Sequence, residues 1–230
     1  MSNTHFANPH GLHDDNHYTT AADMAKLAVY ATSVPKLLDY TSIYEYEFRP
    51  EPKLLTLWNT NRLLKWYDGT IGLKTGFTQQ AGYNLVSCVE RDGMRLIGVV
   101  MGAPVAKSHF TESMELLNYG FNTYSYQKLF SPGEVVGLHP IAKGEKDSFC
   151  MITPVDVGGI AKKGETSDFS YSLELDEGVC APIEKGAPVG PLILQRDATE
   201  IGRYQVLAGE TVSRNRWLGE RKTVLRGTFC

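Results

Sequence analysis

Two segments in the first half of the chain carry apolar residues at helical spacing. The first has four such residues on one helical face: Met24, Leu27, Ala28 and Ala31. The preceding Thr20-Ala-Ala-Asp23 has the pattern of a capping box, in which the threonine side chain accepts from a backbone N–H of the first turn. We therefore predict a helix of about three turns from Thr20 to near Ala31.

Between the two helical segments, the pattern indicates strands. Asp92-Gly93 is a strong signal for a two-residue hairpin turn, and apolar stretches flank it at residues 83–91 and 94–101. Apolar residues occupy both even and odd positions of these stretches, which is typical of strands covered on both faces. We therefore expect an antiparallel sheet with helices on each side. The second helical segment, about residues 107–124, is one candidate cover, with apolar residues at spacings of three and four.

The linking residues have a weaker pattern. Residues 45–48 and 54–58 read as two extended pieces joined around Pro50 and Pro52. Residues 59–64 then read as a short helix or turn.

After Ser131 the chain changes to short strand-like pieces separated by glycine-containing turns. Residues 169–175 alternate between apolar and polar side chains, as in a half-buried strand. The turns are unevenly spaced, which favours a small β-sandwich over a repeat array. The fold class expected is α+β, with a mixed domain over residues 1–127, an all-β domain over 128–212 and a basic tail over 213–230.

Composition and charge narrow the function. The net charge of −3 argues against a nucleic-acid partner, because phosphate binding needs clustered excess Lys and Arg. The first residues show no export signal, and the longest apolar run, residues 96–106, is too short to span a bilayer. The four cysteines lie far apart and give neither a zinc ribbon nor a disulfide framework. No cofactor is indicated.

Lys74-Thr75-Gly76 is the most informative motif in the chain. A strand edge can pair with an extended peptide through main-chain hydrogen bonds, and a glycine there removes a side chain that would block close approach. Lys74 and Thr75 can offer a cation and a hydroxyl to a substrate carboxylate. The motif therefore indicates a peptide-binding strand edge.

The triplet and three other blocks of sequence resemble the D-alanyl-D-alanine carboxypeptidases, the low-molecular-weight penicillin-binding proteins that trim peptidoglycan stem peptides. The blocks occur in the expected order at residues 3–12, 16–25, 59–64 and 72–78. The β-rich part after Ser131 resembles the C-terminal domain of many members. The resemblance implies a partial transpeptidase-like domain followed by a β-sandwich.

The resemblance also implies a reaction. In the family, a serine of a Ser-x-x-Lys motif attacks the carbonyl of the penultimate D-alanine, and water hydrolyses the resulting acyl-enzyme. By resemblance, Lys74 supplies positive potential and Thr75 binds the terminal carboxylate beside Gly76. The backbone N–H of Phe77 forms half of the oxyanion hole. The implied partners are stem peptides ending in D-Ala-D-Ala and, where the nucleophile is present, β-lactams, at the outer face of the bacterial cytoplasmic membrane.

The family's Ser-x-x-Lys and Ser-x-Asn motifs should precede residue 3. Later literal matches at Ser33-Val-Pro-Lys36, Ser125-Tyr-Gln-Lys128 and Ser213-Arg-Asn215 are expected by chance. We therefore expect a C-terminal portion of a carboxypeptidase that is inactive alone.

Other interpretations stay open at this point. Four histidines, His5, His10, His13 and His17, crowd near Asp14 and Asp15, and such clusters can bind metal. A polar loop rich in His and Asp needs no ligand to explain it, so no metal is expected. The β-domain alternatively serves as a non-catalytic peptidoglycan- or protein-binding module. A β-lactamase shares the triplet but does not usually carry the first two blocks. The basic tail with Trp217 fits a remnant of a peripheral membrane anchor, which family members often carry, but its short apolar face favours a solvated tail.

Overall fold

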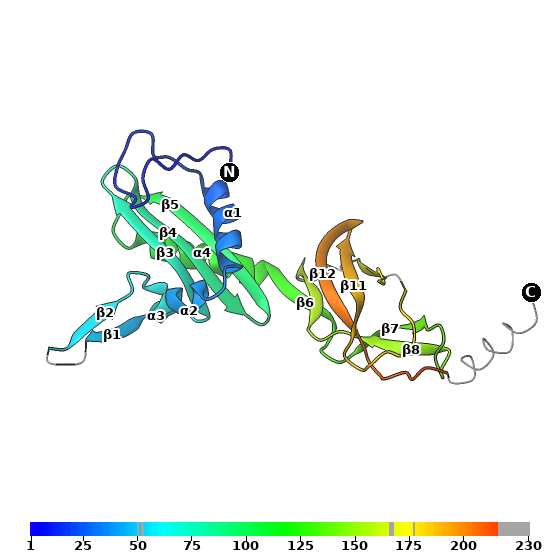
Figure 1. The fold of residues 1–230 in the computed structure, drawn as a ribbon. Helices are drawn as coiled ribbons and strands as arrows, with labels where there is room; N and C mark the ends of the chain where they lie inside the picture. The colour runs from blue at the N-terminus through cyan, green and yellow to red at the C-terminus, as the bar shows by residue number, and fades with distance from the viewer. Residues whose placement is uncertain (50, 52, 166–167, 177, 216–230) are drawn as a thin grey trace, which may run out of the picture. The chain divides into compact units, whose positions relative to one another are not determined.

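The structure is a computed structural model that describes residues 1–215 except 50, 52, 166–167 and 177. The chain divides into two compact units between Ser125 and Tyr126. The elements of the first unit are α1 (Ala21–Thr32), α2 (Leu37–Thr41), β1 (Glu45–Arg49), β2 (Leu55–Trp58), α3 (Leu63–Trp66), β3 (Thr70–Thr78), β4 (Gly82–Arg91), β5 (Met94–Ala103) and α4 (Ser108–Thr123). Strands β3, β4 and β5 form an antiparallel sheet in that order (Figure 1).

Helix α1 begins as its sequence predicts. The side chain of Thr20 accepts a hydrogen bond from the N–H of Asp23 at 3.2 Å, so the predicted cap is confirmed. The acidic side of the box differs from the expectation, because the Asp23 carboxylate is buried and accepts from Thr4 and from the N–H of Asn3 instead. These bonds from Thr4 and Asn3 lower the pKa of Asp23. Asp23 thereby ties the first residues of the chain to α1.

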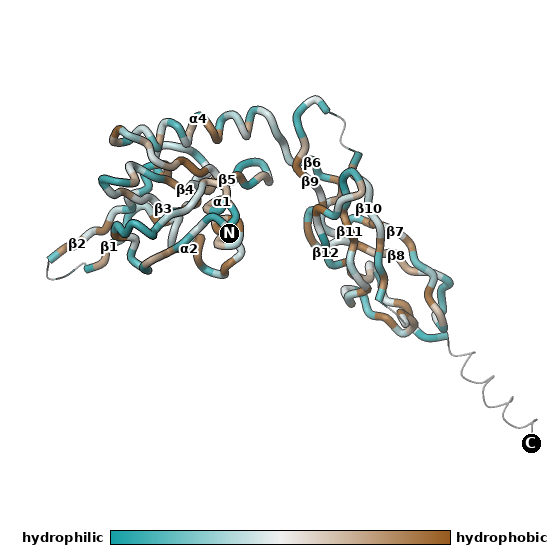
Figure 2. The backbone as a smooth tube through the Cα atoms, turned by 90° about the horizontal axis from the view of Figure 1, so that it is seen from above, coloured by the Kyte–Doolittle hydropathy of each residue, from teal (hydrophilic) through white to brown (hydrophobic). Residues whose placement is uncertain are grey.

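The predicted hairpin is also confirmed. Asp92 and Gly93 have φ angles of 49° and 75°, the left-handed conformation that a two-residue turn of this kind requires. Helices cover both faces of the sheet, as the two-faced apolar pattern predicts. Leu85 and Val89 of β4 pack against α3 and α4, whereas Cys88 packs on the opposite face with Ala28 of α1. Figure 2 shows α4 on one side of the strands and α1 and α2 on the other.

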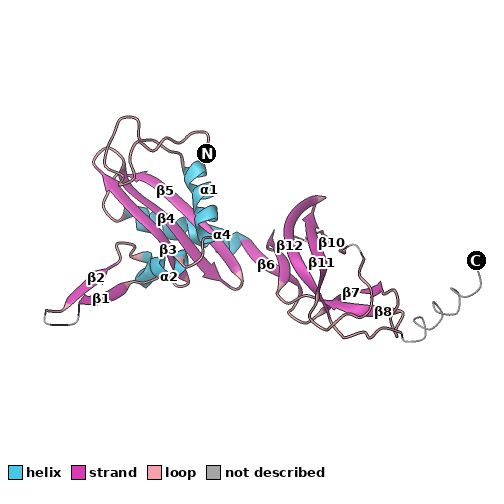
Figure 3. Ribbon diagram, in the orientation of Figure 1, coloured by secondary structure: helices cyan, strands magenta, loops and turns pink. Residues whose placement is uncertain are grey.

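The second unit is built from strands alone within the described residues (Figure 3). They are β6 (Tyr124–Phe130), which begins at the boundary, β7 (Val135–Pro140), β8 (Ser148–Ile152), β9 (Val157–Lys162), β10 (Phe169–Leu173), β11 (Pro188–Arg196) and β12 (Thr199–Ala208). One sheet has the order β10-β11-β12-β8-β7, and β6 pairs with β9. The α+β fold class, a partial transpeptidase-like domain followed by a β-rich domain, is confirmed.

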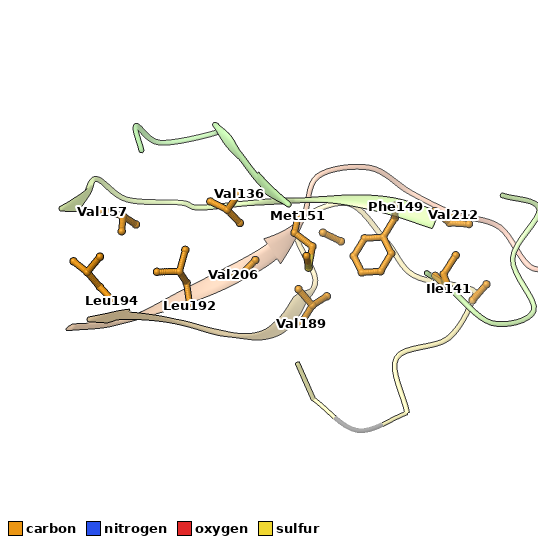
Figure 4. Close-up of a cluster of buried hydrophobic side chains, with 12 residues drawn as sticks. Val136, Ile141, Phe149, Met151, Val157, Val189, Leu192, Leu194, Val206 and Val212 are labelled. Carbon is orange, nitrogen blue, oxygen red and sulfur yellow. The ribbon is translucent and has the colours of Figure 1, made fainter. Parts of the chain in front are cut away.

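One apolar core holds the second unit together. Phe149 and Met151 of β8 face Val189 and Leu192 of β11, as Figure 4 shows, and all four are at most 1% exposed. Val157 of β9 belongs to the same cluster, so the two-stranded pair shares the core of the larger sheet. A fully buried aliphatic or aromatic side chain contributes roughly 2 kcal/mol through its removal from water. The cluster therefore stabilises this unit without help from a disulfide among its described cysteines, Cys150 and Cys180, which are free.

Among the helices in the described part of the chain, none combines the length and apolar character needed to cross a bilayer. The predicted basic tail lies outside the described residues from 216 onwards.

Candidate functional site

The Lys74-Thr75-Gly76 triplet lies on β3, which pairs only with β4 among the described strands and is therefore the edge of its sheet. Lys74, Gly76 and Phe77 are exposed, and Thr75 is partly exposed. No atom lies within 4 Å of the position that a Cβ on Gly76 would take. The strand thus presents an open main-chain edge, the feature that strand addition by an extended peptide requires.

A groove of about 1040 Å³ runs along this edge and brings together segments that are distant in the sequence. Its lining includes Lys74, Thr75, Gly76 and Phe77 of β3, Thr60 and Arg62 before α3, His109 of α4, and a loop of the first seventeen residues with Phe6, His10 and His17. That loop is held by a bridge between His5 and Tyr18.

The charge of the groove is one-sided. Arg62, Lys74 and Lys107 line it, and no Asp or Glu is among its described lining residues. Within the described residues none of these three cations forms a salt bridge; the Lys74 ammonium instead donates to the carbonyl of Thr75 at 2.6 Å. Unpaired cations near a low-dielectric wall attract an anionic group more strongly than paired ones do. The groove is therefore suited to a carboxylate.

Three polar side chains fix the strand in place. Asn61 is fully buried, and its Nδ2 donates to the carbonyl of Gly72 at 3.0 Å. The hydroxyls of Thr60 and Thr75 lie 2.6 Å apart. On the other side, Asn84 of β4 donates to the carbonyl of Gly82 at 2.9 Å and to that of Gly76 at 3.4 Å. The main chain of β3 is thus held at Gly72, two residues before the triplet, and at Gly76, its last residue.

Sequence reasoning identified the triplet and the block 59–64, which resembles the family and was read as a helix or turn, but it did not give the contacts of Thr60, Asn61 and Asn84 with the strand. Helix α3 begins at Leu63, within that block. Asn84 faces Gly76 across the β3–β4 pair, and no local pattern reveals this register. His109 and Lys107 come from the start of α4, and Lys107 adopts a left-handed φ of 73° there.

The literal Ser-x-x-Lys matches lie away from the groove. The Ser33 hydroxyl donates to the carbonyl of Tyr30 at the end of α1, and Lys36 has a left-handed φ of 66°. Lys128 of the other match forms a salt bridge with Asp156 at 2.7 Å in the second unit. Ser213 accepts the N–H of Glu145 through its main chain in that same unit. None of them is among the groove's lining residues.

The four N-terminal histidines are spread along their loop. In the described part of the chain, no three His, Cys, Asp or Glu side chains lie close enough together to hold a metal ion. Two of the histidines stabilise the loop instead: the His5 ring lies 2.6 Å from the carbonyl of Asn16, and His17 Nδ1 accepts from the N–H of Ala7 at 3.1 Å.

Both units match known protein families. Residues 1–105 match the family described as D-alanyl-D-alanine carboxypeptidase, and residues 124–214 match the C-terminal domain of penicillin-binding protein 5. The chain is 32% identical over 216 residues to the D-alanyl-D-alanine carboxypeptidase DacF of Bacillus subtilis, covering 93% of this chain and 56% of that protein. It is 36% identical over 206 residues to DacA of Haemophilus influenzae, covering 87% and 51% respectively.

Solved structures of penicillin-binding proteins are similar to the chain as well. Penicillin-binding protein 5 from Haemophilus influenzae superposes with a TM-score of 0.57 at 32% identity, over 92% of this chain and 61% of that one. A peptidoglycan synthesis regulatory factor (PBP3) from Streptococcus pneumoniae gives a TM-score of 0.74 at 25% identity, over 89% and 60%. The chain spans about half the length of the curated relatives it matches. With the triplet on an open strand edge and both units matched in order, the chain belongs to the D-alanyl-D-alanine carboxypeptidase family.

Proposed function

We propose that this chain carries the substrate-binding part of a serine-type D-Ala-D-Ala carboxypeptidase of peptidoglycan maturation. The observation that carries the proposal is the open β3 edge beside a groove with three cations and no acidic side chain among its described lining residues. The substrate is a stem peptide ending in D-Ala-D-Ala. β-Lactams, which resemble that dipeptide, are ligands of the whole protein where its nucleophile is present.

Each residue of the triplet has a role in this proposal. The peptide adds to β3 through main-chain hydrogen bonds, and Gly76 leaves room for it. Thr75 donates its hydroxyl to the terminal carboxylate, and Thr60 orients that hydroxyl across 2.6 Å. The ammonium of Lys74 adds positive potential, and the N–H of Phe77 stabilises the oxygen of the scissile carbonyl as negative charge develops. We assign no nucleophile among the described residues, because the Ser-x-x-Lys matches lie away from the groove.

We place the family's reaction on the outer face of the bacterial cytoplasmic membrane, where its substrate is found. Residues 1–127 form the peptide-binding domain and residues 128–212 the β-domain in this proposal. The tail of residues 213–230 gives peripheral membrane contact.

A binding experiment on the whole chain tests the role of the triplet. An acetylated tripeptide ending in D-Ala-D-Ala is titrated beside its C-terminal amide, with binding followed by NMR. The carboxylate form is expected to bind at least about tenfold more tightly, because hydrogen bonds to a charged group contribute about 1.5–3 kcal/mol. Thr75→Val removes the hydroxyl at nearly constant volume and should erase most of that preference.

Thr56→Val is the matched control, since Thr56 is also a partly exposed strand threonine but lies on β2. Equal binding of carboxylate and amide by the unchanged chain would refute the proposal. Incubation with a labelled penicillin tests the second part, and a covalent adduct on this chain would contradict the absence of a nucleophile among the described residues.

A further inference from the structure

An aromatic stack stands beside the triplet, and the proposed function gives it no role. The ring of Phe77 lies with its centroid 4.3 Å from that of Tyr83, its cross-strand partner on β4. Tyr83 in turn stacks on His109 of α4 at 5.4 Å with an interplanar angle of 11°, and His109 contacts Phe110 at 4.0 Å. The outermost ring, Phe77, is 56% exposed, whereas His109 at the base is 6% exposed.

The stack fixes the position of an apolar surface that faces the groove. Phe77, Tyr83, His109 and Phe110 all line the groove. A large apolar ring on a strand edge that is backed by three further rings has little freedom left to lose when a ligand covers it. Such a preorganised surface binds apolar groups at a low entropic cost.

Strand geometry indicates which part of a peptide would reach this ring. Side chains alternate along a strand, so Thr75 and Phe77 project from the same side of β3. In the proposed function the terminal carboxylate lies at Thr75 and the scissile carbonyl at the N–H of Phe77. The peptide thus runs from Thr75 towards Phe77 as one moves from its last residue to earlier ones. The residue that precedes the D-Ala-D-Ala pair therefore passes the ring of Phe77.

We propose that Phe77 is a specificity-determining residue that packs against the alkyl side chain of the residue immediately before D-Ala-D-Ala, and that Tyr83 and His109 hold it in position. This inference rests on the proposed function. It names the substrate class more narrowly, as stem peptides whose third residue has a long unbranched side chain. A methyl side chain at that position does not reach the ring.

The charges of the groove are consistent with recognition of the alkyl part of the peptide side chain. The charged side chains among the described lining residues are Arg62, Lys74 and Lys107. No Asp or Glu is among them to pair with an amine at the end of such a side chain. Recognition at this place must therefore come from the methylene groups, because a terminal ammonium finds no carboxylate there. An uncharged alkyl side chain of the same length should bind at least as well as a lysine side chain, because the cations of the groove repel the lysine ammonium.

The test compares three peptides on the full chain by NMR titration: acetyl-X-D-Ala-D-Ala with X as L-alanine, L-norleucine or L-lysine. Norleucine adds three methylene groups to alanine, and half burial of them against a ring corresponds to a roughly fivefold to tenfold gain in affinity. Norleucine is expected to bind more tightly than alanine and at least as tightly as lysine, whose ammonium the three cations of the groove repel. Phe77→Ala should reduce the preference for norleucine over alanine to less than about twofold, because the ring that contacts the added methylene groups is removed. Phe77→Tyr should keep the preference.

Phe48→Ala is the matched control, because Phe48 is a similarly exposed strand phenylalanine, at 61%, on β1. It should keep the full preference. The unchanged chain already gives a decisive comparison if Phe77→Ala fails to fold: equal affinity for the alanine and norleucine peptides overturns the inference and leaves the proposed function standing. Failure of all three peptides to bind refutes the proposed function itself. A loss of affinity for both peptides alike in Phe77→Ala assigns a merely structural role to the ring and also overturns the inference.

Discussion

Replacing Asn61 should destabilise the first unit and loosen the strand that carries the triplet. The Asn61 side chain is fully buried, donates to the carbonyl of Gly72 at 3.0 Å and accepts from the N–H of Leu63 at 3.2 Å. It therefore joins the start of α3 to β3 two residues before Lys74. Asn61→Ala removes both bonds and leaves two buried main-chain groups without partners.

The expected loss follows from these two bonds. An unsatisfied buried polar group costs about 1–3 kcal/mol, so two of them, with some relaxation, should lower the free energy of unfolding by about 3 kcal/mol. Asn61→Asp keeps the acceptor for Leu63 but turns a carboxylate towards the carbonyl of Gly72. Its loss should match or exceed that of Asn61→Ala at pH 7. The loss should shrink as the pH falls towards 4, because a protonated carboxyl can again donate.

Urea denaturation followed by tryptophan fluorescence is the suitable assay. Two of the three tryptophans, Trp58 and Trp66, lie in the first unit and report its unfolding. Asn16→Ala serves as the control, because Asn16 is exposed. A change below about 0.5 kcal/mol for Asn61→Ala would show that water or a shifted backbone satisfies both groups, and the reasoning about this support would be refuted.

Two further predictions concern other parts of the molecule. Gly190 has a φ of 125°, and a Cβ there would lie only 2.3 Å from the carbonyl oxygen of Glu174. Gly190→Ala should therefore lower the free energy of unfolding of the second unit by about 2–4 kcal/mol, measured by urea denaturation followed by circular dichroism. Gly186→Ala, at a φ of 88° with no atom within 4 Å, should cost only about 1 kcal/mol, and equal losses would contradict the role of the close contact. Burial lowers the pKa of His109, against a smaller opposing effect of Glu112, so the fold favours the neutral ring. The contribution of the neutral His109 ring to the stability of the fold is complete above the ordinary histidine pKa of about 6.5. It is lost as the pH falls through the lower pKa of the folded state. The thermal midpoint of the first unit should therefore decrease as the pH is lowered from 7.5 to 5, and it should decrease less steeply in His109→Phe. An unchanged dependence of the midpoint on pH in that variant would refute the role given to His109.

Local patterns were sufficient for those elements whose determinants lie within one turn or one hairpin. The capped start of α1 at Thr20 and the Asp92-Gly93 turn depend on neighbours a few residues away, and the structure confirms both. Helix α2 was not predicted, because it follows a left-handed Lys36 that no sequence rule requires. The order of the five-stranded sheet also lay beyond local reasoning, since β12 pairs with β8 across more than forty residues.

The candidate site shows the same limit at closer range. Lys74, Thr75 and Gly76 could be found because a resemblance gives them together. Thr60 and His109 could not, because each meets the triplet's surroundings only after the chain has folded. The histidine-rich start of the chain was open to two interpretations, a metal site or a polar loop that needs no ligand. His5 and His17 take part in hydrogen bonds to main-chain groups there.

The supports of β3 differ in kind from the cores of the two units, and this difference matters for function. Apolar contacts are non-directional and tolerate shifts of a side chain, whereas hydrogen bonds fix the distance and direction of a main-chain group. Asn61 holds Gly72, and Asn84 reaches Gly82 and Gly76, so the triplet lies between two directional supports. An edge strand that must pair with an incoming peptide needs its main-chain groups in register before the peptide arrives. Polar side chains on neighbouring segments supply that register here, while the exposed side of the strand stays open.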